Sequence, residues 1–339
     1  MTTRNSKIAR TIAAGVSALV LATAALAEPQ AEFVFETAPF EQCHASTLME
    51  TQDGQLLSAW FGGTKEGNND VAIWMSRRGP DGWSAPTEMA RHEETPTWNP
   101  VLFRALDGAT WLYYKFGTSP RMWTGAYRRS DDDGRTWSAT KAMPAGLLGP
   151  VRAKPLVLPN GVIVAGTSVE SYQSWTAYAE ISQDQGKTWR RSGPIAHPGE
   201  PQGVIQPTVV PISGGLRMFM RGRNIGRICY ADSYDGGENW SPAYETSLPN
   251  PNAGVDAVAL EDGRLVMIYN HTDKGRTPIN LAVSSDSGTS WESFLELETE
   301  PGEYSYPALI QTSDGDLSMT YTWKRRRIKH VRVPLKDVP

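Results

Sequence analysis

A short turn motif recurs four times along the chain at almost constant spacing. Its first copy, residues 130–137, reads Ser-x-Asp-x-Gly-x-Thr-Trp. Later copies begin at Ser182, Ser233 and Ser284, so that successive serines lie 52, 51 and 51 residues apart. Asp and Gly at turn spacing, followed by a small polar residue and a Trp, are typical of a turn that leads into a strand. A period near 50 residues predicts an array of equal structural units.

A second turn motif recurs with nearly the same period. Asp-Gly or similar two-residue turns, each with apolar and partly alternating neighbours on both sides, lie at Gly54, Gly108, Gly161, Gly214, Gly263 and Gly315. Such turns join two paired strands. Six units of about four strands predict an all-β fold, a six-bladed β-propeller spanning residues 28–339. The sixth unit ends after residues 328–333 without an outer strand, and we expect residues 32–37 to supply it and close the ring.

The repeated turn motif is predicted to be structural. Its Asp and Gly shape the turn, its Ser or Thr satisfies the backbone, and its Trp packs between neighbouring blades. A degenerate copy, residues 76–84, marks the first blade. Because the motif serves the fold, we expect the chemistry to lie elsewhere.

The N-terminal segment 1–27 has the pattern of a secretory signal peptide. Three basic residues precede an apolar stretch, and Ala25-Leu26-Ala27 forms a small-residue cleavage site. We therefore expect a periplasmic or secreted protein, with no membrane insertion after signal cleavage. Cys43 and Cys229 fall in the first and fourth blades, roughly opposite in the ring, so two free thiols are expected.

The charge balance bears on partners. The chain has 33 Lys and Arg against 37 Asp and Glu, a net charge of −4, which argues against nucleic acid as a partner. No Cys/His spacing predicts a zinc site, and no motif requires a cofactor. Acidic turns such as residues 130–134 offer oxygen ligands for calcium, but the turn itself needs no metal.

Polar side chains gather at the predicted start of each inner strand, which in a propeller opens on one rim around the central channel. They are His44, Asn99, Lys154, Gln206, Asp256 and Tyr306. A proline after the polar residue is ordinary at a strand start. Six different functional groups aimed at one rim predict a polar ligand pocket. The next strands and loops add Arg221, Arg223 and Arg276, and the loop after the second strand adds Glu66 and Asp70.

On these motifs the chain resembles the sialidase superfamily, in particular bacterial Asp-box sialidase-like proteins. The segment YSYPAL matches the family's tyrosine segment and points to Tyr306. MFMRG matches the second arginine, at Arg221, and GRTPINLAVSSDSG is similar to the segment of the third, at Arg276. The resemblance implies an arginine triad on a substrate carboxylate, a tyrosine nucleophile assisted by glutamate, and an aspartate acid/base.

The sequence departs from that pattern at three places. The segment of the first arginine appears as HASTL, where His44 stands instead. The partner glutamate aligns with Gln206, whose amide accepts no proton. In the loop of the acid, Glu66 is the nearest carboxyl group and Asp70 the second.

The predicted function is therefore an exported, exo-acting glycoside hydrolase, exo-α-sialidase-like, that cleaves a terminal acidic sugar from a glycan or oligosaccharide. The predicted catalytic residues are Tyr306, His44, Glu66 and Asp70; the predicted substrate-binding residues are Arg221, Arg276, Asn99, Lys154, Gln206 and Asp256. Trp123 and Trp175 are either sugar-stacking or packing residues.

Two alternatives stay open from the sequence. A β-eliminating lyase on uronate glycans would use His44 and Tyr306 for proton transfer and Arg221 for the carboxylate. A non-catalytic glycan-binding propeller would keep the blades without the chemistry.

Overall fold

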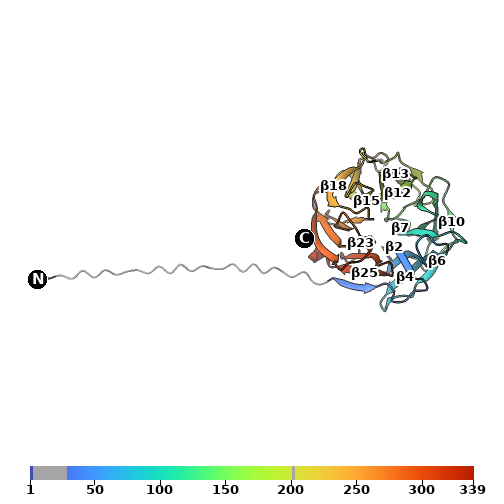
Figure 1. The fold of residues 1–339 in the computed structure, drawn as a ribbon, viewed down its shortest axis with the longest axis horizontal. Coiled ribbons are helices and arrows are strands. Elements are labelled where there is room, and N and C mark those ends of the chain that lie inside the picture. Colours follow the sequence, from blue (N-terminus) through green and yellow to red (C-terminus); the bar gives the residue numbers. More distant parts are fainter. Residues whose placement is uncertain (3–28, 201–202) are drawn as a thin grey trace.

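The computed structural model describes residues 1–2, 29–200 and 203–339, and its strands form six antiparallel sheets arranged as a ring (Figure 1). The predicted all-β, six-bladed propeller is confirmed. The predicted signal peptide, residues 1–27, lies outside the described residues except for its first two. In the described part of the chain no helix is long and apolar enough to cross a membrane.

Each blade runs from an inner strand at the channel to an outer strand at the rim of the disc. Blade 1 contains β2 (Gln42–Glu50), β3 (Leu56–Gly63), β4 (Ala72–Gly79) and β5 (Gly82–Trp83), with β6 (Thr87–Ala90) also on β4. Blade 2 contains β7 (Thr97–Arg104), β8 (Thr110–Phe116), β9 (Thr124–Ser130) and β10 (Lys141–Ala142). Blade 3 contains β11 (Leu156–Val157), β12 (Ile163–Glu170), β13 (Trp175–Ser182) and β14 (Arg190–Arg191).

The other three blades follow the same order. Blade 4 contains β15 (Val204–Ile212), β16 (Gly215–Gly222), β17 (Arg227–Ser233) and β18 (Tyr244–Pro249). Blade 5 contains β19 (Asp256–Ala259), β20 (Leu265–Tyr269), β21 (Ile279–Ser284) and β22 (Glu292–Glu298). Blade 6 contains β23 (Tyr304–Gln311), β24 (Leu317–Trp323), β25 (Arg327–Val333) and, outermost, β1 (Gln30–Phe33). Two single-turn 3₁₀ helices are η1 (Pro120–Met122) and η2 (Leu335–Asp337).

The hydrophobic core lies between neighbouring blades. One cluster joins Leu57, Phe61 and Ile73 of blade 1 to Trp98 and Leu112 of blade 2. Strand side chains alternate between the two faces of a sheet, so each blade contributes apolar residues to the blade before it and the blade after it. The ring is thus held by six similar interfaces, and the channel is left for the inner-strand residues.

The repeated motif forms the turn that its sequence predicts. In the first copy Asp132 accepts hydrogen bonds from Ser130 Oγ at 2.8 Å and from the backbone N–H of Thr136 at 2.7 Å. Trp137 donates its indole N–H to the carbonyl of Gly134. Gly134 has φ +81°, and a Cβ there would lie 2.6 Å from Leu57 of the neighbouring blade. Turn geometry and close packing therefore both require glycine at this position.

The N-terminal strand closes the ring, as predicted. β1 pairs with β25 in antiparallel register, from Gln30 opposite Arg332 to Phe33 opposite Lys329. The predicted segment was 32–37, whereas the strand is 30–33 and only one further backbone bond, from Val34 to Ile328, continues it.

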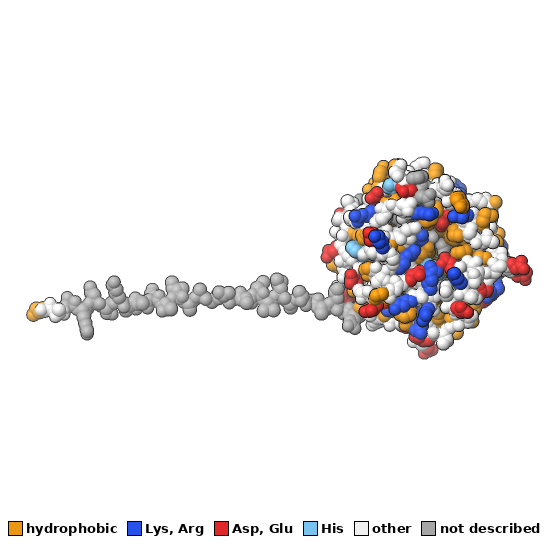
Figure 2. All heavy atoms as spheres, viewed as in Figure 1, with side chains coloured by type: hydrophobic (Ala, Val, Ile, Leu, Met, Phe, Trp, Pro, Cys, Tyr) orange, Lys and Arg blue, Asp and Glu red, His pale blue; other side chains and the backbone are white. Residues whose placement is uncertain are grey.

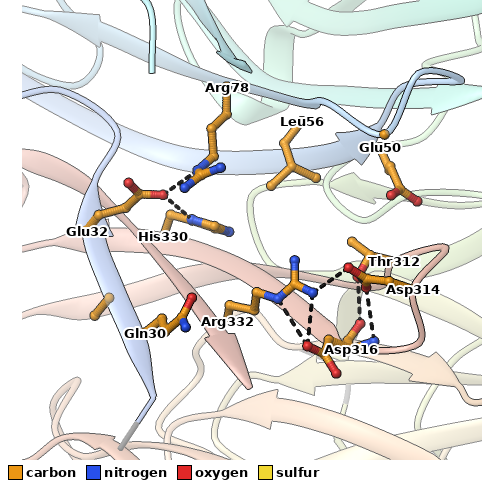
Figure 3. A pocket seen from close by; sticks show the side chains of 12 residues that line it. Gln30, Glu32, Glu50, Leu56, Arg78, Thr312, Asp314, Asp316, His330 and Arg332 are labelled. Atoms are coloured by element: carbon orange, nitrogen blue, oxygen red, sulfur yellow. Dashed lines mark hydrogen bonds and ion pairs between the residues drawn. The ribbon is translucent and has the colours of Figure 1, made fainter. Parts of the chain in front are cut away.

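Glu32 of the closing strand connects blade 6 to blade 1 (Figure 3). Its Oε1 lies 2.9 Å from His330 Nδ1 and accepts hydrogen bonds from Arg78 Nε at 2.6 Å and Trp83 Nε1 at 3.2 Å. Of these partners, His330 first and then Arg78 lower the pKa of Glu32 from 4.5 to about 2. Glu32, Arg78 and His330 line a cavity of about 550 Å³ at the joint between the two blades. None of the residues predicted from the sequence as site residues lines this cavity.

Candidate active site

The inner strands of four blades share a β-bulge close to their first residues. The register shifts between His44 and Thr47, Trp98 and Val101, Ile205 and Thr208, and Ser305 and Ala308. In each bulge one residue has a positive φ: Ala45 (58°), Asn99 (38°), Gln206 (57°) and Tyr306 (51°). Left-handed backbone in non-glycine residues is strained, and bulges next to active sites change where a side chain points. The bulge therefore explains why the side chains of Asn99, Gln206 and Tyr306 do not follow the regular alternation of their strands.

This bulge changes which residue of the first blade is equivalent to the other predicted site residues. The residue equivalent to Asn99, Gln206 and Tyr306 is Ala45, and His44 precedes it by one position. Blades 3 and 5 have no register shift in their short inner strands β11 and β19. A polar residue followed by proline marks three of the four bulges; blade 1 has the bulge without this pair, and Lys154-Pro155 of blade 3 has the pair without a register shift.

Tyr306 is the centre of the group. Its hydroxyl oxygen accepts a hydrogen bond from Arg221 Nη1 at 2.6 Å. The guanidinium carbons of Arg152, Arg221 and Arg276 lie 5.7, 5.8 and 5.8 Å from the centre of its ring. Figure 2 shows Lys and Arg side chains gathered around the middle of the face in view, although the chain as a whole carries a net charge of −4. Three guanidinium groups around one phenol create a site for an anion.

Arg221 joins three of the residues in this site. Besides Tyr306, its Nη1 donates to Gln206 Oε1 at 3.2 Å, and its Nε donates to Asn252 Oδ1 at 2.8 Å. Arg221 is 8% exposed and Gln206 3% exposed. The structure thus brings together three of the predicted residues, Arg221, Gln206 and Tyr306, from two blades.

Arg276 lies in the loop between β20 and β21 of blade 5. Its Nη2 donates to the carbonyl of Asn252 at 3.3 Å, and its Nη1 is buried with no partner among the described residues. Burial lowers the pKa of Arg276. Asn270 holds the backbone of this segment by donating to the carbonyls of Arg276 and Tyr304. A buried N–H group without a partner is available for a ligand carboxylate.

Arg152, which sequence reasoning did not select, lies buried beside Tyr306. It is 2% exposed, and its Nη2 donates to the carbonyls of Val255 and Pro307, at 2.7 and 2.5 Å. The second bond fixes the residue after Tyr306, at the bulge. Its position in the sequence could have identified it: Arg152 lies two residues before Lys154, in the segment RAKPLV at the start of the third blade.

His44 lies directly against Tyr306. The two ring centres are 4.2 Å apart, and His44 Nδ1 lies 3.1 Å from Thr322 Oγ1. The side chain is 2% exposed. Burial, and then the charges of Arg325 and three further arginines, hold the pKa of His44 well below 6.5. His44 is therefore neutral at physiological pH.

Lys154 and Asp256 form an ion pair inside the channel. Lys154 Nζ lies 3.0 Å from Asp256 Oδ2 and from the carbonyl of Ala257. Asp256 is 1% exposed and also accepts hydrogen bonds from Thr208 Oγ1 and the backbone N–H of Leu309. Both of its oxygens therefore have protein donors, and the pair ties blades 3, 4, 5 and 6 together.

Asn99 is 3% exposed at the bulge of blade 2.

The two predicted acids of the first-blade loop have partners of their own. Glu66 forms an ion pair with Arg325, which also binds Glu303 at 2.8 Å. Asp70 accepts hydrogen bonds from the backbone N–H and hydroxyl of Thr64 at 2.7 and 2.6 Å, and the hydroxyl bond is the largest contribution to its lowered pKa. Arg325, from the turn between β24 and β25, was missed because its sequence, KRRR, looks like a surface charge run.

The two tryptophans have different surroundings. Trp175 is 9% exposed, and its ring lies 5.7 Å from the guanidinium carbon of Arg221 and 5.1 Å from that of Arg223. Trp123 packs on Trp98, with ring centres 5.9 Å apart, at the core cluster of blades 1 and 2. Trp175 thus borders the three arginines around Tyr306, namely Arg152, Arg221 and Arg276, which we call the arginine group. Trp123 packs against the core.

Two further chemical features concern the described residues. Cys43 and Cys229 are both buried and free, as predicted. Within the described ranges, no three His, Cys, Asp or Glu side chains are grouped as metal ligands would be.

Comparison with known proteins places this geometry in a family. Residues 54–319 match the family described as BNR repeat-like domain. A sialidase of Bacteroides fragilis strain YCH46 is 24% identical over 231 residues, which is 62% of this chain and 41% of that protein. A sialidase of Micromonospora viridifaciens is 26% identical over 168 residues, 46% of this chain and 25% of that protein. The chain therefore spans less than half the length of either curated relative.

Solved structures share the fold at low identity. The NanB sialidase of Streptococcus pneumoniae superposes with a TM-score of 0.76 at 14% identity, over 91% of this chain and 71% of that one. A protein of unknown function from Dyadobacter fermentans superposes with a TM-score of 0.77 at 17% identity, over 90% and 97% of the two chains.

Proposed function

The chain belongs to the BNR repeat-like domain family and is sialidase-like in sequence and fold, and from this membership we propose that it is a glycosidase that removes a terminal acidic sugar from a glycan. The observation that carries the proposal is the hydrogen bond from Arg221 Nη1 to the Tyr306 hydroxyl oxygen, with Arg276 and Arg152 around the same ring. This arrangement combines a site for a carboxylate with an oxygen nucleophile.

The carboxylate of the sugar would be held by Arg221 and Arg276. The buried Nη1 of Arg276 has no protein partner in the described residues, so its N–H groups are free for the ligand. Arginine suits this task because its planar fork can donate two parallel hydrogen bonds to one carboxylate. Such a bond fixes the orientation of the sugar ring over Tyr306.

The hydroxyl oxygen of Tyr306 would face the anomeric carbon. Because Arg221 donates to this oxygen, one lone pair is occupied and the other is left for the sugar. The oxygen then stabilises the positive charge that develops at the anomeric carbon when the glycosidic bond breaks. Gln206 keeps Arg221 in place but takes up no proton.

We further propose that the protein is exported, through the signal peptide of residues 1–27, and acts in the periplasm or outside the cell. The sequence pattern of that segment supports this step.

A product assay on the purified mature protein tests the proposed reaction. The protein is incubated with sialylated and uronate-containing oligosaccharides, and the products are read by mass spectrometry. We expect a released acidic sugar with one added water. An unsaturated product lacking that water would replace the proposal by a β-elimination, and unchanged sugar that stays bound would replace it by a binding function.

A further inference from the structure

Glu170 is a partly buried carboxylic acid at the end of β12, beside the arginine group. It is paired with Trp175, the first residue of β13, next to the turn that joins the two strands. Paired residues on neighbouring strands project to the same face of a sheet. The ring of Trp175 lies 5.7 Å from the guanidinium carbon of Arg221. Glu170 therefore shares a face with a side chain that contacts Arg221.

The preceding residue on this face confirms the direction. Ser168 stands two positions before Glu170, and residues two apart on a strand point to the same side. Ser168 Oγ accepts the backbone N–H of Gln206 at 3.2 Å. This face of β12 is therefore directed toward the start of β15. Glu170 lies on the same face, two residues nearer to the end of β12.

No hydrogen bond or ion pair of the Glu170 carboxyl group is formed with the described residues. The charged groups that face it are Arg221 from β16, Arg223 from the loop after β16, and Arg121 from η1. Burial raises the pKa of Glu170 above 4.5, and these three charges oppose the rise. A carboxyl group with a raised pKa and no protein partner is suited to donate a proton.

A second cavity begins next to this residue. It has a volume of about 340 Å³ and is lined by Pro120, Arg121, Trp123, Leu147, Leu148, Val169 and five neighbours, and we call it the side cavity. Val169 precedes Glu170 in β12, and Arg121 faces both the side cavity and the Glu170 carboxyl group. Neighbouring residues of a strand point to opposite faces, so the side cavity lies at the junction of blades 2 and 3, on the face of β12 opposite to the Glu170 side chain, and Arg121 connects the two.

We propose that Glu170 is the general acid of the reaction at this site, and that the side cavity receives the leaving group. The inference rests on the proposed glycosidase function. The O–H bond of Glu170 breaks and a new O–H bond forms on the glycosidic oxygen while the bond from that oxygen to the anomeric carbon breaks. A water molecule then gives its hydroxyl to the anomeric carbon and its other proton to the Glu170 carboxylate. The sum is hydrolysis, with Glu170 regenerated.

The other acidic groups near the site are already engaged. Glu66 is ion-paired with Arg325, and Asp70 is bound by Thr64 within its own loop. Gln206 has no proton of suitable acidity to give. Glu170, in contrast, has no protein partner among the described residues and is left to serve as the acid.

The test compares Glu170→Gln and Glu170→Asp with the native protein on two substrates. Sialyllactose has a poor leaving group that needs protonation, whereas 4-methylumbelliferyl sialoside has a good leaving group that does not. We expect Glu170→Gln to lower kcat on sialyllactose by about 100-fold or more and on the umbelliferyl substrate by only a few-fold. Glu170→Asp should recover part of the loss. If the product assay releases a uronate, the corresponding glucuronide pair is used.

The pH profile provides a second measurement. Because the acid must be protonated, kcat of the native protein should fall as pH rises through the raised pKa of Glu170, and Glu170→Gln should lack this decrease. Glu292→Gln, an exposed glutamate on the outer strand β22, is the matched control and should behave as the native protein.

The outcomes separate the two proposals. Absence of any cleavage by the native protein would overturn the glycosidase function itself. Cleavage that Glu170→Gln reduces equally on both substrates, with an unchanged pH profile, would leave the glycosidase in place and remove Glu170 as its acid. A further variant, Val169→Trp, partly fills the side cavity. It should raise KM for sialyllactose but not for methyl sialoside, a third substrate whose leaving group is only methanol. The same KM for sialyllactose in Val169→Trp as in the native protein would remove the side cavity from the proposal.

Discussion

The carboxylates of the outer turns and the carboxylate of Glu170 have opposite surroundings. Asp286, in the last copy of the repeated motif, accepts hydrogen bonds from Ser284 and Ser290 and from two backbone N–H groups, and despite some burial its pKa is lowered to about 2. Glu170 has no such donor among the described residues, and its pKa is raised. A carboxylate that recurs with its donors supports the fold, whereas a carboxylate that occurs once and lacks donors is available for chemistry.

Arginines on one strand show the same contrast. Arg217 and Arg221 are both on β16 and both 8% exposed. Arg217 makes two parallel bonds of 2.7 Å with Asp232 and a third with the carbonyl of Ser287. Arg221 instead has only neutral partners, Asn252, Gln206 and Tyr306. The first charge is neutralised inside the protein, and the second is left for an anionic ligand.

The largest expected effect separates these two arginines. Arg221→Ala removes the donor to Tyr306 and one side of the carboxylate site, and we expect kcat/KM to fall by about 1000-fold with little change in Tm. Arg217→Ala leaves Asp232 without its partner and should cost about 3 kcal/mol of stability while kcat/KM stays near the native value. Steady-state kinetics and thermal unfolding of both variants check this pair. Similar losses of activity in both would contradict the assignment.

The closing strand offers the next effect, on stability in acid. The pKa of Glu32 is about 2 in the folded protein and near 4.5 in the unfolded chain. The unfolded chain therefore binds more protons between these values, so the stabilisation by Glu32 is complete above pH 4.5 and is lost as pH falls toward 2. Glu32→Gln should lower the free energy of unfolding at pH 7, and its difference from the native protein should vanish near pH 2. A constant difference across urea titrations at pH 7, 4 and 2 would contradict the role of the charge.

The sequence allowed most of the fold and part of the site to be predicted. Six blades follow from two repeated turns, because each turn has its own local cause in Asp, Gly and Trp. The shared tyrosine and arginine motifs located Tyr306, Arg221 and Arg276, which the structure brings together. That prediction needed only residues close in sequence to a motif.

The rest of the site depends on packing between blades. Arg152 reaches Tyr306 from blade 3, and its burial follows from contacts with the carbonyls of residues 255 and 307. The bulge that aligns Ala45 with Tyr306 is a matter of strand register, which one blade's sequence does not show. Glu170 carries no motif at all. Its position follows from the hairpin register with Trp175 and from the hydrogen bond of Ser168, on the same strand, with the backbone of Gln206 on the neighbouring inner strand.

A smaller effect tests the outer turns. Asp286→Asn keeps the size of the side chain but removes the charge that Ser290 and the backbone N–H groups stabilise. We expect Tm at pH 7 to fall by about 2 °C, since the turn is exposed and only one of several, and kcat to stay unchanged. The lowered pKa of Asp286 predicts that this difference shrinks as pH falls below 3.8. Differential scanning calorimetry at pH 7 and pH 3 measures it.

The smallest effect has the opposite sign and concerns Glu170. A carboxyl group whose pKa is raised on folding binds its proton more tightly in the folded protein, so stability decreases as pH rises from 4.5 through the folded pKa. At pH 7 the charge of Glu170 is therefore a cost to the fold, and Glu170→Gln should leave Tm equal or slightly higher there, with no gain at pH 4. Asp286→Asn, measured beside it, should lose stability at pH 7. A lower Tm for Glu170→Gln at pH 7 would mean that the carboxylate stabilises the native state, like those of the outer turns, and that its lack of partners has been compensated by the surrounding arginines. An unchanged or higher Tm together with the loss of turnover would show that this residue is kept at the expense of stability, as expected for a group retained for chemistry.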